Sequence, residues 1–255
     1  MINPVIAGIT VRAMLGRRRA LLFAIPAVVL IALTVLLRAS NPTGVQWPAN
    51  VLGTFGFSVL LPLTALIIGT SVLGAEIDDG SIVHLLATPV RRSSVVATKF
   101  LVATGLTMVF AAVPELIAAL IAGGGSAPSL NVKGDLITIS TGKFALGLFV
   151  GALACSVIYN AVFVMLSVAT TRAIAVGLLY VLVWEVLLAN FVGGARLLSV
   201  SHYGLGIANG FVADPALQAG LNVLTSVVMG IIVTAAALLL AASLLSSFTI
   251  QGEPA

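Results

Sequence analysis

Charged side chains are scarce in this sequence: Asp, Glu, Lys and Arg make up 8% of its 255 residues. Soluble domains carry about 25% charged residues, so this deficit excludes an ordinary soluble protein. The chain is instead 60% hydrophobic, with a mean hydropathy of +1.21. Its apolar residues form long unbroken runs, not the short alternating segments typical of membrane β-barrels. We therefore predict an all-α, polytopic integral membrane protein.

Cysteine and nucleotide-binding motifs are also lacking. The single cysteine, Cys155, excludes a disulfide within the chain and argues against a cysteine-rich metal site. The only Gly-Lys pair, Gly142-Lys143, is followed by Phe and has Ile137 where a phosphate-binding loop needs its leading glycine. We therefore expect this chain to bind no metal and no nucleotide cofactor, and any ATP-driven work to be done by another polypeptide.

Six apolar runs approach or exceed the roughly 20 residues that a membrane-spanning helix needs. We expect a single domain over 1–255 with spans at 20–38, 52–74, 96–122, 144–169, 173–192 and 221–246. Residues 1–19 mix apolar and basic side chains, which favours an amphipathic helix at the membrane surface or a basic flank that only fixes orientation. Residues 123–135 should form a flexible turn, and the apolar segment 193–220 should hold one or two short helices.

The basic residues gather on one side of this predicted topology. Of the 12 Lys and Arg residues, eight fall before the first span or in the connections that follow spans two and four, and four fall in the other connections. The positive-inside rule then places both termini, the tail 247–255 and the loop 75–99 in the cytoplasm. The formal net charge of +4 is explained by this orientation, so we expect lipid and no nucleic acid as a partner.

The most polar stretch, EIDDGSIVHLLATPVRRSSVVATK at 76–99, separates the second and third spans. Ile82, Leu85 and Leu86 recur at the spacing of one helix face. Thr88 precedes a proline and is biased away from helical geometry, so the helix should stop just before it. A helix of about two turns is not stable alone in water. It therefore needs a surface to lie on.

This stretch resembles the loop between the second and third spans of ABC-2-type permeases, the membrane subunits of ATP-driven exporters. The resemblance implies a short cytoplasmic coupling helix that docks on an ABC ATPase, with two ATPase subunits holding ATP and Mg²⁺ and a second six-span copy or relative completing the complex. It also implies re-entrant helices before the sixth span. The alternative is a loop that only connects two spans. The expected ATPase-coupling residues are Glu76, Gly80, Ser81, Ile82, Val83, His84, Leu85, Leu86, Pro89, Arg91, Arg92 and Lys99.

Two acids fall inside predicted spans: Glu115, which follows Pro114, and Glu185, which follows Trp184. A charge at the centre of a membrane helix costs about 2.5–3.5 kcal/mol on insertion scales, so such residues face protein or water. Glu115, Trp184 and Glu185 are therefore candidates for lining a substrate route. The alternative for each acid is a protonated or hydrogen-bonded packing role between helices.

We expect the permease subunit of a bacterial ABC exporter in the cytoplasmic membrane, moving a hydrophobic, amphipathic or drug-like molecule. One alternative is a proton- or ion-coupled carrier that works alone through Glu115 and Glu185. Another is an assembly or anchoring subunit without a transport route. Gly147 and Gly151 form a GxxxG pattern, which indicates close packing of another helix and does not indicate a function.

Overall fold

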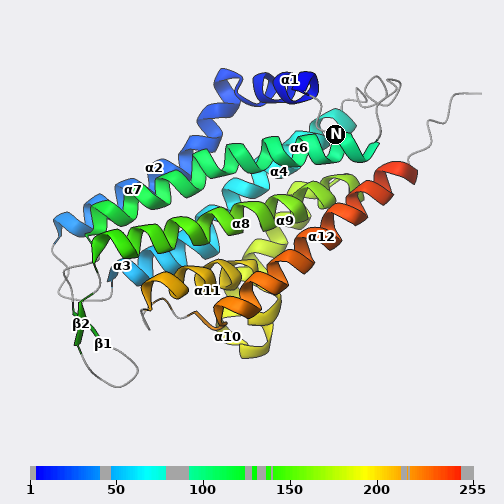
Figure 1. Cartoon of the computed structure of the whole chain (residues 1–255). Helices are drawn as coiled ribbons and strands as arrows, with labels where there is room; N and C mark the ends of the chain where they lie inside the picture. Colours follow the sequence, from blue (N-terminus) through cyan, green and yellow to red (C-terminus); the bar gives the residue numbers. More distant parts are fainter. Residues whose placement is uncertain are drawn as a thin grey trace, which may run out of the picture.

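The computed structural model describes residues 4–40, 47–78, 92–123, 128–130, 136–138, 140–213, 217 and 219–247. Its long helices lie side by side in one bundle (Figure 1). The elements are α1 (Pro4–Met14), α2 (Arg17–Ala39), α3 (Trp47–Asn50), η1 (Val51–Leu60), α4 (Leu61–Asp78), α6 (Arg92–Thr107), η2 (Met108–Ala112), α7 (Val113–Ala122), β1 (Pro128–Leu130), β2 (Leu136–Thr138), α8 (Thr141–Ala169), α9 (Ala173–Leu179), η3 (Tyr180–Leu188), α10 (Ala189–Phe191), η4 (Gly193–Leu198), α11 (Val200–Val212) and α12 (Val223–Ser247).

Within the described ranges, five helical runs are long and apolar enough to cross a membrane. They are Ala20–Ala39, Trp47–Gly74, Ser93–Ala122, Thr141–Ala169 and Val223–Ser246. The expected span at 173–192 corresponds to a shorter apolar helix, Ala173–Leu188. The chain is therefore a multi-pass membrane protein, and the count of six spans stays a prediction.

The connection between the third and fourth spans differs from the expected flexible turn. Its strands β1 and β2 pair antiparallel, with Pro128 opposite Thr138 and Leu130 opposite Leu136. The second strand reads Leu-Ile-Thr, and β-branched residues such as Ile and Thr favour extended backbone. The chain is helical, as predicted, and a short two-stranded hairpin at one end of the bundle adds to that description (Figure 1).

Two helices form the centre of the bundle and two lie at its edge. In the spans of α4 and α8, 67% and 61% of the most apolar window is buried, against 22% in α2 and 17% in α12. Helix α8 packs on α4, α11 and α12. The outer faces of α2 and α12 carry exposed apolar side chains such as Leu21, Leu36, Leu224 and Leu239, as expected for helices that meet lipid or another membrane subunit.

Three stretches of π-helix lie within the described apolar helices: η1, η2 and η3. Each of the first two is followed closely by a proline. Leu61 and Pro62 come directly after η1, and Val113 and Pro114 come directly after η2. The backbone N–H groups of Leu61 and Val113 donate to carbonyls five residues back, at Gly56 and Met108. Proline has no N–H to continue the α-helical ladder, and a widened turn is one way to accommodate it.

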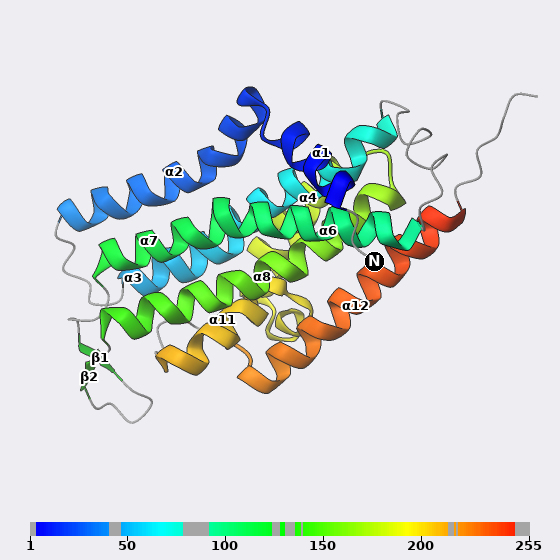
Figure 2. The same cartoon turned by 45° about the horizontal axis from the view of Figure 1, so that its top comes forward.

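Different elements lie at the two ends of the bundle. Helix α1 and the C-terminal end of α12 lie at one end, and the β-hairpin lies at the other (Figures 1 and 2). Helix α1 packs on α6 and α4 through Ile6, Thr10 and Met14, while Val5 and Ile9 are exposed. This two-faced pattern suits a helix at a membrane surface. The first and last described helices thus reach the same end of the bundle, and the assignment of that end to the cytoplasm stays a prediction.

Candidate functional site

Most of the expected ATPase-coupling residues lie outside the described residues. These are Gly80, Ser81, Ile82, Val83, His84, Leu85, Leu86, Pro89 and Arg91. The structure places three of the set: Glu76 near the end of α4, and Arg92 and Lys99 in the first turns of α6. These two helices are the ones that the loop connects.

Glu76 and Lys99 form an ion pair between those two helices. The Lys99 Nζ atom lies 2.6 Å from Glu76 Oε1. It also donates to the backbone carbonyl of Val72, at 2.8 Å. Lys99 is 0% exposed and Glu76 is 33% exposed. The lysine charge therefore faces α4 inside the bundle and does not face the solution.

Glu185 is buried at the centre of a hydrogen-bond network. Its Oε1 atom accepts from the Tyr180 hydroxyl and the Val200 N–H, each at 2.9 Å. Its Oε2 atom accepts from the hydroxyls of Ser199 and Ser201, at 2.5 and 2.7 Å, and from the Ser201 N–H at 3.3 Å. Two backbone N–H groups and three hydroxyls thus surround the carboxyl group, and the Ser199 and Ser201 hydroxyls also lie 3.0 Å from one another.

Through this network, a residue distant in the sequence caps the N-terminus of helix α11. Val200 and Ser201 are its first residues, and the first N–H groups of a helix have no partner within the helix. The Glu185 carboxylate accepts from both, and negative charge is favoured at a helix N-terminus. Ser199 is the N-cap residue and accepts from the His202 N–H. One carboxylate on η3 thus fixes where α11 begins.

Further side chains fasten the turn that leads into α11. Trp184 Nε1 donates to the Leu198 carbonyl at 3.1 Å, and the Tyr203 hydroxyl donates to the Leu197 carbonyl at 2.5 Å. Cys155 Sγ on α8 donates to the Val200 carbonyl at 3.3 Å. Trp184 and Glu185, which the sequence analysis put forward as route candidates, are both occupied in joining η3 to this turn.

Glu115 has a contrasting environment. It is 1% exposed, on α7 immediately after Pro114, and its Oε1 atom is without a hydrogen-bond partner among the described residues. The carboxylate lies against Gly56 of η1, where an added Cβ atom would meet its two oxygens at 2.7 and 2.8 Å. A cavity of about 10 Å³ adjoins it, lined also by Pro26 and Phe110. That volume is at the lower limit for a single water molecule, about 10–15 Å³.

The GxxxG pair of α8 packs against α11. An added Cβ atom at Gly151 would meet the Gly204 carbonyl at 2.5 Å, and one at Gly147 would meet the Ala208 carbonyl at 2.9 Å. Both distances are shorter than real Cβ atoms adopt, so only glycine fits at these two positions. The small residues of α8 therefore receive a helix of the same chain, the one that Glu185 caps.

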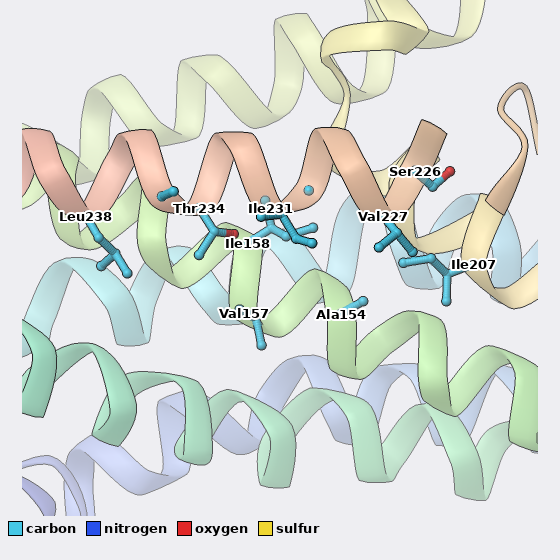
Figure 3. Close-up of a pocket in the computed structure, with 11 residues that line it drawn as sticks. Ala154, Val157, Ile158, Ile207, Ser226, Val227, Ile231, Thr234 and Leu238 are labelled. Carbon is cyan, nitrogen blue, oxygen red and sulfur yellow. The ribbon is translucent and has the colours of Figure 1, made fainter. Parts of the chain in front are cut away.

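An apolar groove of about 540 Å³ lies between α8 and α12, flanked by Ile207 of α11 (Figure 3). Its walls are nearly all aliphatic, with Ser226 and Thr234 as the polar exceptions. A second cavity of about 550 Å³ lies between α4, α8 and α9, where Ser71, Thr170 and Arg172 add polar groups. Volumes of this size fall in the range of small-molecule sites, about 300–1,000 Å³.

Comparison with known families identifies the fold. The model of a family described as ABC-2 family transporter protein matches residues 15–184, about two thirds of the chain. The chain belongs to this family. It is an ABC transporter permease, a membrane transport component that is not itself catalytic, and ABC-2 permeases work with ABC ATPase partners. No curated protein matches the chain.

The family match ends one residue before Glu185 and thus leaves out α11 and α12. The sequence analysis missed the partners of Glu185, although the run Ser199-Val200-Ser201 carries the serine N-cap signal of a new helix. It also missed the pairing of Lys99 with Glu76. Because 23 positions separate these two residues, no local periodicity connects them.

Proposed function

We propose that this ABC-2 permease is the membrane subunit of a bacterial ABC exporter in the cytoplasmic membrane. The observation that carries the proposal is the family match over residues 15–184, which includes the polar stretch 76–99 between two spans. Two copies, or this chain and a relative, enclose the route. Two cytoplasmic ATPase subunits bind ATP and Mg²⁺ and act on the short helix of that stretch.

The proposed docking contact is apolar. Ile82, Leu85 and Leu86 enter a groove on the ATPase, and each buried side chain contributes about 1.5–3 kcal/mol. The surrounding charges, acids before the helix and arginines after it, set the direction of docking by complementarity. ATP-driven closure of the two ATPase subunits then moves the ends of the second and third spans.

The proposed cargo is a hydrophobic, amphipathic or drug-like molecule. The groove between α8 and α12 supports this choice, because its walls offer aliphatic contacts and almost no hydrogen-bonding groups. The separate cavity beside Arg172 combines apolar and polar groups, which also suits an amphipathic ligand. Sites lined mainly by apolar side chains with a few polar groups are typical for such ligands.

The direct test is co-purification of the chain with its ABC ATPase from cells that express both. We expect the wild-type chain to retain the ATPase and to raise its ATP hydrolysis. Leu85→Asp with Leu86→Asp should weaken retention by at least about tenfold, since a charge replaces each buried contact. The matched control, Leu85→Met with Leu86→Met, keeps apolar side chains of similar volume and should retain the ATPase.

A double Asp variant that holds the ATPase as well as the wild type does would show that the docking helix is placed wrongly. A wild-type chain that holds no ATPase would overturn the exporter proposal as a whole.

The second candidate function, a proton- or ion-coupled carrier, is favoured by one observation: the Oε1 atom of Glu115 is buried and unpaired among the described residues. Uptake driven by a pH gradient, in vesicles without any ATPase, would support it.

A further inference from the structure

By resemblance to the family, Lys99 belongs with the residues that meet the ATPase. The position of Lys99 in the structure excludes that contact. The Lys99 side chain is 0% exposed, and its Nζ atom already contacts Glu76 and the Val72 carbonyl. A charge that is covered by its own chain adds nothing to a docking surface. Lys99 therefore needs a role inside the permease.

The two attachment points of Lys99 on α4 are one helical turn apart. Val72 and Glu76 are separated by four residues, so the lysine contacts both the backbone and a side chain along the same face of α4. Two such contacts oppose sliding of α6 along α4 and rotation of α4 about its own axis. They lie in the C-terminal half of α4 and the first half of α6, the two helices that flank residues 79–91.

Helix α1 packs over this part of the bundle. It contacts α6 and also α4, with Met14 2% exposed and Thr10 5% exposed. Lys99 is 0% exposed and Glu76 is 33% exposed, so only the lysine end of the pair is fully shielded from water. Separating the pair would leave that buried lysine charge without its partner, which is costly. Any motion that pulled α4 and α6 apart at this level would leave an uncompensated charge inside the bundle.

We propose that the Glu76–Lys99 pair is a strut that makes the loop-side ends of α4 and α6 move as one body when the ATPase displaces the loop. The inference rests on the proposed function, because a strut has no task without a partner that pushes. Glu76 and Lys99 are then positioning residues: they transmit motion and leave binding of the ATPase to the loop itself. Without the strut, a push on the loop would bend one helix end relative to the other.

The test uses the complex of the full chain with its ABC ATPase, reconstituted in lipid vesicles. Glu76→Gln with Lys99→Met removes both charges at nearly constant volume, so no unpaired charge is buried and the chain should fold. We expect ATPase retention to stay within about twofold of the wild type and permease-dependent ATP hydrolysis to fall about tenfold, a typical size for coupling between two sites. The matched control is Lys143→Met, the same change at an exposed lysine on α8, and it should alter neither quantity.

The charge exchange Glu76→Lys with Lys99→Glu separates a strut from a merely structural contact. It restores the ion pair but loses the donor to the Val72 carbonyl, so hydrolysis should recover in part, above the neutral double variant. Normal hydrolysis in the neutral double variant would overturn the strut, as would equal loss in both double variants. Loss of ATPase retention in the neutral variant would assign the pair to docking instead. A wild-type chain that retains no ATPase would overturn the proposed function, and the strut with it.

Discussion

Two buried glutamates in one bundle differ in the hydrogen-bond donors around them. The difference separates an acid that packs helices together from one that is available to a proton or a ligand. Glu185 is 0% exposed, and its carboxylate accepts five hydrogen bonds from Tyr180, Ser199, Val200 and Ser201. Glu115 is 1% exposed, and its Oε1 atom meets no donor in the part of the chain that the structure describes.

The sequence presents these two acids alike, one in the third predicted span and one in the fifth. Burial alone therefore does not assign a function to an acid in a membrane helix. The partners do: a carboxylate with a full set of donors is committed to holding helices, whereas one without them remains available to a proton or a ligand. Four substitutions test this distinction, in order of expected effect.

Removal of the Glu185 carboxylate should have the largest effect. Glu185→Ala leaves two N–H groups and three hydroxyls in a buried site without their shared acceptor. Each buried donor left unsatisfied costs about 1–3 kcal/mol, and partial rearrangement should hold the total loss of unfolding free energy to about 3–5 kcal/mol. Denaturant titration in detergent, followed by the fluorescence of Trp47 and Trp184, measures it. A loss below about 1 kcal/mol would show that the cap of α11 is dispensable.

Glu185→Gln is the matched control for that experiment. The amide keeps one acceptor oxygen but places an NH₂ donor against other donors. We expect it to fall between the wild type and Glu185→Ala in unfolding free energy. A Gln variant as stable as the wild type would mean that the negative charge at the start of α11 contributes nothing.

A methyl group at Gly56 should have the second largest effect. The new Cβ atom would lie 2.7–2.8 Å from the Glu115 oxygens, so one side must shift. Overpacking of this kind costs about 1–3 kcal/mol of unfolding free energy. Gly105→Ala is the matched control, because an added Cβ atom there meets nothing within 4 Å, and a helical Gly→Ala change should stabilise by about 0.5–1 kcal/mol.

The double variant Gly56→Ala with Glu115→Ala tests whether the two sites touch. If the Glu115 carboxylate is what the methyl group meets, its truncation should recover much of the loss, and the two changes should be strongly non-additive. Additive effects, within about 0.5 kcal/mol, would show that Gly56 is required for another reason.

Tyr180→Phe should have a smaller effect than either of these. It removes one of the donors to Glu185, at 2.9 Å, while the ring keeps its edge contact with Phe163. A single hydrogen bond contributes about 0.5–1.5 kcal/mol net, so we expect a loss of about 1 kcal/mol by the same titration. A loss as large as that of Glu185→Ala would mean that the network depends on Tyr180 and is not shared among its donors.

The sequence predicts the position of the two acids but not the partners that distinguish them. Long apolar runs place the spans, and membrane energetics place Glu115 and Glu185 inside the protein, because both depend on residues that are adjacent in the chain. The donors of Glu185 lie up to 16 positions away, and Gly56 lies 59 positions from Glu115. Such distances carry no periodicity, so only the packing of the helices reveals which carboxylate is satisfied.

The polar stretch at 76–99 shows a second limit, that of resemblance. A local resemblance predicts the short apolar helix, yet it also groups Lys99 with docking residues although Lys99 is 0% exposed and turned toward α4. The hairpin at 128–138 and the π-helical turns before Pro62 and Pro114 depend on geometry that hydropathy averages out. A resemblance thus shows which residue types occur in which order along the segment. Only the fold shows whether each side chain faces the protein interior or the surface.

The smallest expected effect belongs to Glu115→Gln. The substitution keeps the volume beside Gly56, and no hydrogen bond to Oε1 is lost among the described residues, so the unfolding free energy should change by less than about 1 kcal/mol. The same substitution at Glu185 should cost more. If Glu115 instead serves a proton-coupled carrier, Glu115→Gln should abolish pH-driven uptake in vesicles while stability stays unchanged. A loss of stability at Glu115 equal to that at Glu185 would erase the distinction between the two acids, because it would mean that Glu115 has structural partners as strong as those of Glu185.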